Sequence, residues 1–212
     1  SEKFINMFNI CQHKNPLSNT LSKNGYISEN ITHVILTHLH FDHAGGATKL
    51  NNEGEIVPSF PNAQYFISNK NWQAGLNPNP KDKASYLKEN YMILNERKIL
   101  NIVPENTEIL DGVSTYIVNG HTFGQQLIKV HADGKTIVFC SDLIPLKSHL
   151  KLPWIMGYDL NAILTLEEKE KFLNLASENN WILFFYHDPL VSAVTIEKND
   201  KCFEVLDELR RK

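Results

Sequence analysis

The sequence has no run of roughly eighteen apolar residues, so nothing in it is predicted to cross a membrane. It also has no excess of positive charge, because 21 Lys and Arg face 24 Asp and Glu, for a net charge of −3. Nucleic-acid-binding proteins usually carry a basic face, so we expect no nucleic acid as partner. Three scattered cysteines, at positions 11, 140 and 202, suit a reducing compartment better than a disulfide framework. No signal-peptide pattern is visible, which predicts a cytoplasmic location, although the chain begins with Ser1 and a removed leader is left open.

Internal repeats, low-complexity tracts and long linkers are missing as well. With 212 residues, of which 42% are hydrophobic, the chain is long enough to bury one sizeable core. Pro, Gly and Asn cluster in 51–62 and 74–83, and we interpret both segments as loops within one unit. We therefore predict a single domain over residues 1–212.

Short segments rich in β-branched and aromatic residues predict strands, and helical spacing of apolar residues predicts helices. Thr165 and Glu168 have the spacing of a capping box, which would start one helix at Thr165. Strands mixed with helices on this scale predict an α/β or α+β layered fold. The predicted strands are 32–37, 64–68, 113–119, 126–130, 135–140 and 181–186, with a hairpin turn at 131–134, and the predicted helices are 82–100 and 165–180.

Side chains with metal-binding chemistry follow four of these strands, at the point where each strand ends. The first strand leads into the segment THLHFDHAGG at 37–46, and the others lead to His121, Asp142 and His187. Loops at this edge of a sheet are where a scaffold usually presents ligands and catalytic groups. Agreement at four strand ends is a stronger signal than any one motif, so we predict one shared site.

Neutral imidazole and carboxylate are the usual nitrogen and oxygen ligands of zinc. In an extended loop, two histidines of the first segment can face one metal ion while the next Asp and His turn toward a second. Further ligands from the other strand ends would complete each site, with one carboxylate between the two ions. The predicted set is His38, His40 and His121 for the first ion, Asp42, His43 and His187 for the second, and Asp142 as the bridge.

The motifs H-x-H-x-D-H at 38–43, G-H-T at 120–122, S-D at 141–142 and H-D at 187–188 resemble those of the metallo-β-lactamase fold superfamily of metallohydrolases. Within it, the chain looks nearest to the branch of lactonases and methyl parathion hydrolase-like enzymes. The resemblance implies a four-layer αβ/βα sandwich. It also implies two divalent metal ions, Zn first, with Mn, Fe or Co as alternatives. Only 37 residues precede His38, which leaves open whether the first N-terminal strands of that fold are lacking.

Several positions depart from other branches of this superfamily. Asp142 stands where zinc β-lactamases usually have cysteine, and His40 stands where flavodiiron oxidoreductases have Glu. The frequent H-T-P-G-H reads HTFGQ here, with Phe123 and Gln125 as the changes. Some lactonases have an active-site tyrosine three residues after the bridging aspartate, where this chain has Pro145. β-Lactamase activity and iron-dependent redox chemistry therefore become less favoured.

The resemblance and the ligand set predict a dinuclear-metal-dependent hydrolase. In this prediction a metal-bridging hydroxide cleaves a lactone or another ester, and Asp42 shuttles the proton to the leaving group. The alternative is phosphotriester or phosphodiester hydrolysis on the same centre. The expected partner is a small-molecule ester, lactone or phosphoester, and a homodimer is left open.

The segment 146–159 follows the bridging aspartate and could fold over the metals. It is interpreted either as an ordinary packed connection or as a wall of the substrate pocket, with His149, Trp154 and Tyr158 as candidate substrate-binding residues. Cys140 is expected to be a buried thiol rather than a ligand. For Asp188, a role in orienting an imidazole and a role in forming a turn are equally open.

Overall fold

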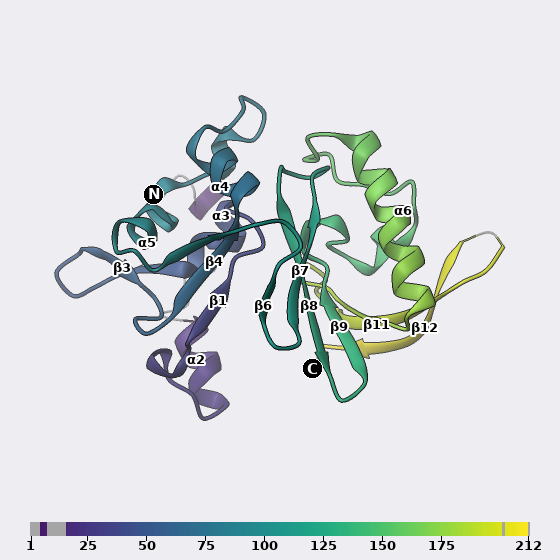
Figure 1. Ribbon diagram of the computed structural model, residues 1–212, viewed down its shortest axis with the longest axis horizontal. Coiled ribbons are helices and arrows are strands. Elements are labelled where there is room, and N and C mark those ends of the chain that lie inside the picture. The colour runs from purple at the N-terminus through teal and green to yellow at the C-terminus, as the bar shows by residue number, and fades with distance from the viewer. Residues whose placement is uncertain (1–4, 8–15, 201, 212) are drawn as a thin grey trace.

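The computed structural model describes residues 5–7, 16–200 and 202–211. Two sheets face each other in the middle of the molecule, and helices cover their outer sides (Figure 1). Helix α4 (Asn69–Leu76) lies against the smaller sheet, and α6 (Ala162–Glu178) covers the larger one. The order helix, sheet, sheet, helix is the four-layer sandwich that the sequence motifs implied.

The other helices and the strands are short. The remaining helices are α2 (Pro16–Lys23), α3 (Phe41–Ala44) and α5 (Met92–Glu96). The strands are β1 (His33–Ile35), β2 (Thr48–Leu50), β3 (Ile56–Pro58), β4 (Gln64–Ser68), β5 (Leu100–Val103), β6 (Glu108–Leu110), β7 (Val113–Val118), β8 (Gln125–Ala132), β9 (Lys135–Phe139), β10 (Ile182–Phe184), β11 (Val191–Lys198) and β12 (Phe203–Arg210).

The larger sheet has seven strands in the order β12-β11-β10-β9-β8-β7-β6. Strand β10 pairs in parallel with β9, whereas β8 runs antiparallel to both β7 and β9. The C-terminal ends of β7, β9 and β10 therefore reach the same edge of the sheet. This edge is where the segments with His121, Asp142 and His187 begin.

The smaller sheet has three parallel strands in the order β1-β4-β5. Gln126 on β8 ties the end of β1 to the larger sheet. Its backbone N–H donates to the carbonyl of Thr37 at 2.8 Å, and its side-chain Nε2 donates to the carbonyl of Leu36 at 2.7 Å. These bonds hold the loop after β1 beside the strand ends of the larger sheet.

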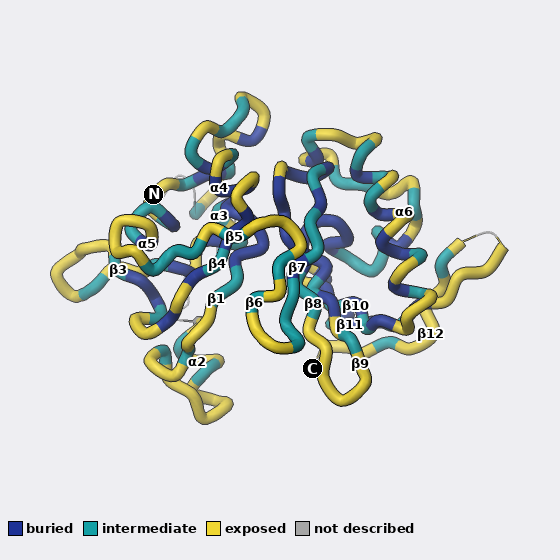
Figure 2. The backbone as a smooth tube through the Cα atoms, in the orientation of Figure 1, coloured by how far each residue is buried: buried dark blue, intermediate teal, exposed yellow. Residues whose placement is uncertain are grey.

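Each sheet has its own apolar core, and the buried stretches of the chain lie along the facing strands and the inner sides of the helices (Figure 2). Phe172, Leu173 and Ala176 of α6 pack on buried side chains of the larger sheet, such as Leu127 and Leu183. Burial of such side chains stabilises the fold by roughly 1.5–3 kcal/mol each. The loops of the site therefore start from two packed layers.

The predicted helix over 82–100 is wrong. Only Met92–Glu96 forms an α-helix there, while Lys83–Ser85 and Lys88–Asn90 form 3-10 turns. The reason is tertiary, because Tyr86 is extended and its backbone forms a β-bridge with His40. Apolar side chains at helical spacing are buried here through turns instead of along one helix face.

The predicted capping box at Thr165 is also wrong. Helix α6 begins at Ala162, and the side chain of Asn161 caps it by accepting from the backbone N–H of Leu164 at 3.1 Å. Glu168 instead accepts from the backbone N–H groups of Asn119 and Gly120, at 2.8 and 2.9 Å. The carboxylate therefore fixes the segment before His121. Among the described helices, none has both the length and the apolar character that a membrane span requires.

Candidate metal centre

The loop after β1 presents its histidines because of its backbone conformation. It stays extended up to His40, with φ −63° and ψ 149°, and then enters the single turn of α3. Side chains two residues apart on an extended chain point to the same side, so His38 and His40 face together. The turn of α3 redirects Asp42 and His43 away from them. One short segment thus supplies two separate groups of candidate ligands.

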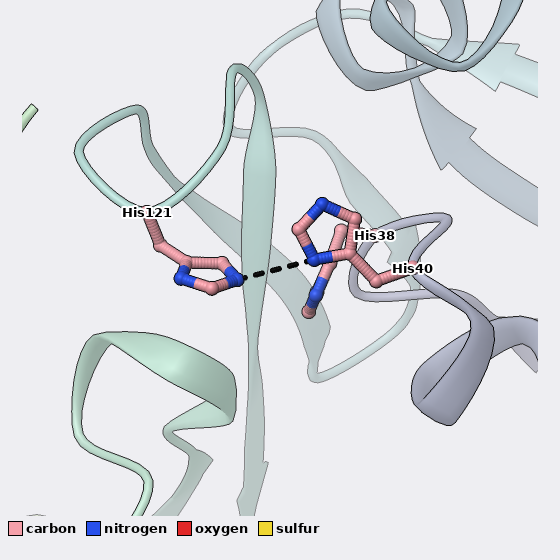
Figure 3. A group of neighbouring side chains, drawn as sticks. All are labelled: His38, His40 and His121. Atoms are coloured by element: carbon pink, nitrogen blue, oxygen red, sulfur yellow. Dashed lines mark hydrogen bonds between the residues drawn. The ribbon is translucent and has the colours of Figure 1, made fainter. Parts of the chain in front are cut away.

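The first group is His38, His40 and His121, whose ligand atoms all lie within 4.8 Å of one another. His121 Nε2 lies 3.2 Å from His40 Nδ1, and the three rings converge from two loops (Figure 3). All three residues are buried. In the structure these three side chains have the spacing that one bound cation requires.

The second group is Asp42, His43, Asp142 and His187, again within 4.8 Å. His43 Nε2 lies 3.3 Å from His187 Nε2 and 3.5 Å from an oxygen of Asp42. The side chains of Asp42 and His187 are 38% and 33% exposed. This second group is therefore open to solvent, in contrast to the first.

Asp142 lies between the two groups. Its Oδ2 is 3.3 Å from His121 Nε2 and 3.9 Å from His38 Nε2. Its Oδ1 is 3.2 Å from the Nε2 atoms of both His43 and His187. One carboxylate thus directs one oxygen toward each group, which is the arrangement of a bridging ligand.

The donor set fits two divalent cations. His38 Nε2 and Asp142 Oδ1 are buried and have no hydrogen-bond partner. Buried polar atoms are otherwise nearly always paired, so orphaned atoms at a convergence of imidazoles need an explanation. Atoms of this kind in a set of nitrogen and oxygen donors are what zinc or a similar ion binds.

The pKa shifts of these side chains favour the protonation states that bind metal. Burial, reinforced by the neighbouring histidines, holds the pKa of His38 well below its usual value. Burial also lowers the pKa of His40, although Asp82 opposes the shift. Burial acts to raise the pKa of Asp142, but the nearby imidazoles of His187 and His43 outweigh it and hold this pKa well below the usual range. A neutral imidazole and an ionised carboxylate are the protonation states that bind metal.

Two aspartates near the first group could not be found by the sequence analysis. Asp159 Oδ1 lies 2.9 Å from His121 Nδ1, and Asp82 Oδ2 lies 3.7 Å from His40 Nε2. Both carboxylates are buried. Asp159 lies 38 residues after His121 in the chain, and Asp82 lies in a different loop from His40, so only folding brings each pair together and no spacing marks them.

The changed motif HTFGQ has a structural account. Gln125 is buried at the start of β8, and its Nε2 donates to the hydroxyl of Ser141 at 2.9 Å. Ser141 has a positive φ of 45°, an uncommon conformation that leads directly into Asp142. Gln125 therefore supports the strained turn that presents the carboxylate.

The three candidate substrate-binding residues have different surroundings. His149 is partly buried with an unpartnered Nδ1, and burial and Lys169 lower its pKa. Trp154 is half exposed, and the ammonium of Lys151 lies 4.6 Å from its ring centre. Tyr158 is 79% exposed. Within the described part of the chain, no hydrogen bond or ion pair joins any of the three to the ligand groups, so their role in binding stays a prediction.

Two alternatives left open by the sequence can be compared with the structure. Cys140 is fully buried, and burial raises the pKa of its thiol, so it lies in the core and outside both ligand groups. The carboxylate of Asp188 accepts from the backbone N–H groups of Lys147, Leu190 and Val191 at 2.8 to 2.9 Å. These bonds are those of a turn-forming aspartate.

A groove of about 1190 Å³ opens beside the second group. Asp42 and His43 form part of its wall, and Ile35, Val130 and Phe139 contribute apolar side chains from both sheets. The groove gives this side of the site access from solvent.

The layered fold and the two groups of histidine and aspartate side chains define an α/β sandwich with a candidate metal centre. Residues 9–187 match the family model of the Metallo-beta-lactamase superfamily. The chain belongs to this superfamily.

Known relatives and solved structures agree with the assignment. An N-acyl homoserine lactonase of Bacillus thuringiensis is 24% identical over 173 residues, which cover 80% of this chain and 61% of the relative. The chain thus spans about three fifths of the length of the curated relatives it matches. A probable metal-dependent hydrolase from Staphylococcus aureus superposes with a TM-score of 0.88 at 24% identity, over 100% of this chain and 73% of that one. The dizinc quorum-quenching lactonase AidC superposes with a TM-score of 0.79 at 20% identity, over 96% and 73%.

Proposed function

We propose that the protein is a dinuclear-metal-dependent hydrolase that cleaves a lactone or another carboxylic ester. The observation that carries this proposal is the position of Asp142, which directs Oδ2 toward His121 and Oδ1 toward His43 and His187. A single carboxylate shared in this way serves two cations rather than one. The proposed ligands are His38, His40 and His121 for one ion, Asp42, His43 and His187 for the other, and Asp142 between them.

Two bound divalent ions would lower the pKa of water toward about 7 and polarise the carbonyl oxygen of the substrate. The protein's own residues hold the loops of the site in fixed positions. Asn71 ties the loops of the site together, because its Oδ1 accepts from the N–H of Leu39 and its Nδ2 donates to the carbonyl of Phe123, both at 2.8 Å. Rigid loops of this kind hold reacting groups in a productive geometry.

Asp42 is the proposed proton carrier. Its carboxylate is 38% exposed, lies on the groove side of the site and is held by α3, whose backbone carbonyl at Asp42 accepts from Tyr186 Oη at 3.2 Å. Asp42 takes a proton from the attacking water as the water oxygen bonds to the carbonyl carbon. It then gives this proton to the ring oxygen when the carbon–oxygen bond breaks, which leaves a hydroxyl group and a carboxylic acid, and the acid releases its remaining proton to solvent to become a carboxylate.

The choice of a lactone or ester is supported by the relatives, several of which are named N-acyl homoserine lactonases. Asp142 in the bridging position, with Cys140 in the core, is the feature that argues against a β-lactamase. The metals proposed are Zn ions first, with Mn, Fe or Co as substitutes.

The test is proton release by zinc- or manganese-loaded protein against lactones, simple esters, β-lactams and phosphotriesters. We expect turnover of lactones or esters, and loss of it in Asp42→Asn, which removes the proton carrier and a ligand of the second ion. Turnover of phosphotriesters alone would replace the proposed reaction with phosphoester hydrolysis. Binding of fewer than two ions per chain would contradict the dinuclear centre itself.

A further inference from the structure

The first ligand group has two buried carboxylates directly behind it, one for each of two histidines. His121 turns Nε2 toward the group, where it lies 3.2 Å from His40 Nδ1 and 3.3 Å from Asp142 Oδ2. Its other ring nitrogen, Nδ1, donates to Asp159 Oδ1 at 2.9 Å. Because an ionised carboxylate only accepts, this bond places the proton of the neutral ring on Nδ1.

His40 has the opposite orientation. It turns Nδ1 toward His121, and its Nε2 faces Asp82 Oδ2 at 3.7 Å. Both His40 Nε2 and Asp82 Oδ1 are buried without a hydrogen-bond partner. A small movement of either side chain would bring His40 Nε2 within hydrogen-bond distance of the Asp82 carboxylate. Asp82 would then accept from His40 and hold the proton of the ring on Nε2.

Hydrogen bonds of neighbouring residues link the segments that carry Asp82 and Asp159. The hydroxyl of Thr122, the residue after His121, donates to Asp82 Oδ2 at 3.3 Å and pairs with Tyr86 Oη at 2.8 Å. Lys81, the residue before Asp82, donates through Nζ to the backbone carbonyl of Asp159. The loop before Tyr86 is therefore linked to both histidines and to the segment that carries Asp159.

The two ligand groups differ in charge, and this difference assigns a role to Asp82 and Asp159. The second group contains the carboxylate of Asp42, whereas His38, His40 and His121 supply only neutral donors. Across the described residues, no Lys or Arg forms an ion pair with Asp82 or Asp159, whose partners at that distance are the imidazoles of His40 and His121. Carboxylates that accept from the far nitrogen of a metal-binding histidine fix its tautomer and raise its basicity.

We propose that Asp82 and Asp159 are positioning residues that select the tautomers of His40 and His121 and strengthen cation binding in the first group. The proton sits on Nε2 of His40 and on Nδ1 of His121, which leaves His40 Nδ1 and His121 Nε2 as the donor atoms. This inference rests on the metal centre of the proposed function, and it concerns how tightly the first group binds its ion.

The first arm of the test measures zinc binding. Zn²⁺ is titrated against a chromophoric chelator with wild type, Asp82→Asn, Asp159→Asn and the control Asp111→Asn, whose carboxylate is exposed. We expect each of the first two variants to weaken one zinc ion by about 10–100-fold while the other changes less than about twofold. Asn keeps the shape of Asp and one accepting oxygen, so the loss of zinc affinity measures the contribution of the negative charge. Unchanged affinities would overturn the proposal, as would equal weakening of both ions.

The second arm needs no metal and no activity. In metal-free protein the ¹⁵N shifts of the imidazole rings report which nitrogen carries the proton. We expect a protonated Nδ1 on His121 in wild type and a redistribution in Asp159→Ala, with Asp111→Ala unchanged. The same tautomer in Asp159→Ala as in wild type would overturn the role of Asp159. If wild type bound fewer than two zinc ions, the proposed function would fail, while this arm would still decide whether Asp159 sets the tautomer.

Discussion

The two ligand groups are made from the same kinds of side chain, yet their surroundings differ. The side chains of His38 and His121 are 0% and 3% exposed, whereas those of Asp42 and His187 are 38% and 33% exposed. The first group is backed by buried carboxylates, and the second faces a groove. An enclosed group with neutral donors suits an ion that stays bound. An open group with its own carboxylate suits an ion that meets substrate and exchanges with solvent.

Asp142 is the one side chain that both groups share, so its loss has the largest expected effect. Asp142→Ala removes an oxygen from each site and leaves five histidines and Asp42 without the carboxylate that two divalent ions would share. We expect a folded protein that binds metal poorly and retains less than about one thousandth of the activity, a loss of at least roughly 4 kcal/mol in transition-state stabilisation.

Metal content by elemental analysis and turnover measured side by side test this expectation, with circular dichroism as the check on folding. Asp188→Ala is a useful control because this aspartate forms a turn beside the site. Normal metal content and turnover in Asp142→Ala would rule out the bridged centre.

The next largest effects separate the two groups. His38→Ala removes a ligand from the enclosed group, and His187→Ala removes one from the open group, so each variant should bind about one ion. The ion left in His187→Ala should leave slowly, since it sits in the buried group. The ion left in His38→Ala should exchange rapidly.

Release of zinc to an excess of chelator, followed by stopped-flow absorbance, measures both rates. Wild type should then show a fast and a slow phase of equal amplitude. A single phase of zinc release in wild type, or equal release rates in the two variants, would mean that burial of the first group does not slow the exchange of its ion.

The two groups of candidate ligands could be predicted because two simple regularities locate them. His38 to His43 are contiguous, and His121, Asp142 and His187 each follow an apolar strand that ends at the same sheet edge. Asp82 and Asp159 follow no strand and lie in loops whose paths depend on tertiary contacts, such as that between Lys81 and the carbonyl of Asp159. The sequence therefore predicts the atoms that would touch the metals better than the residues that orient them.

The predicted secondary structure was likewise right where local composition decides it and wrong where tertiary contacts decide it. Six predicted strands correspond to β1, β4, β7, β8, β9 and β10, and their ends shift by only a few residues. Strand β12 was missed because it is largely exposed and charged, without alternation of apolar residues. The helix over 82–100 was wrong because pairing of Tyr86 with His40 overrides the local pattern. Local composition found six strands but not the largely buried β11, and local periodicity fails where long-range pairing decides the backbone.

A substitution at Gly120 should disturb the enclosed group alone. A Cβ at this position would lie 2.4 Å from Thr165 Oγ1 and 2.5 Å from the backbone nitrogen of Thr165, so β7 and α6 would have to separate. Gly120→Ala should cost about 1–3 kcal/mol of unfolding free energy, typical of overpacking. It should also move His121, the next residue.

Chemical denaturation measures the stability of Gly120→Ala, and chelator competition shows which zinc ion is weakened. We expect the slowly released ion to be affected and the rapidly released ion to be nearly unchanged. Gly157→Ala is a matched control, since a Cβ there would meet no atom within 4 Å. Loss of both ions to the same degree would show that the two groups are not independent.

The smallest effect concerns Lys169, which helps to close the enclosed side. Its buried ammonium donates to the carbonyls of Lys151 and Trp154 at 2.8 and 2.6 Å, in the segment that leads to Asp159. Burial lowers the pKa of Lys169 to about 8. The unfolded chain therefore binds more protons at this residue between pH 8 and about 10.4, and the free energy of unfolding should rise with pH across that window.

Lys169→Met keeps the length of the side chain but does not titrate. Between pH 7 and 9.5, wild type should gain on the order of 1–2 kcal/mol relative to Lys169→Met, because the cost of burying the charge is present below pH 8 and is relieved above it. Urea denaturation of both proteins at several pH values measures the difference, in which other titrating groups cancel. Parallel curves would mean that the ammonium keeps its solvation, and the segment over the enclosed group would then be more open than the buried position of Lys169 indicates.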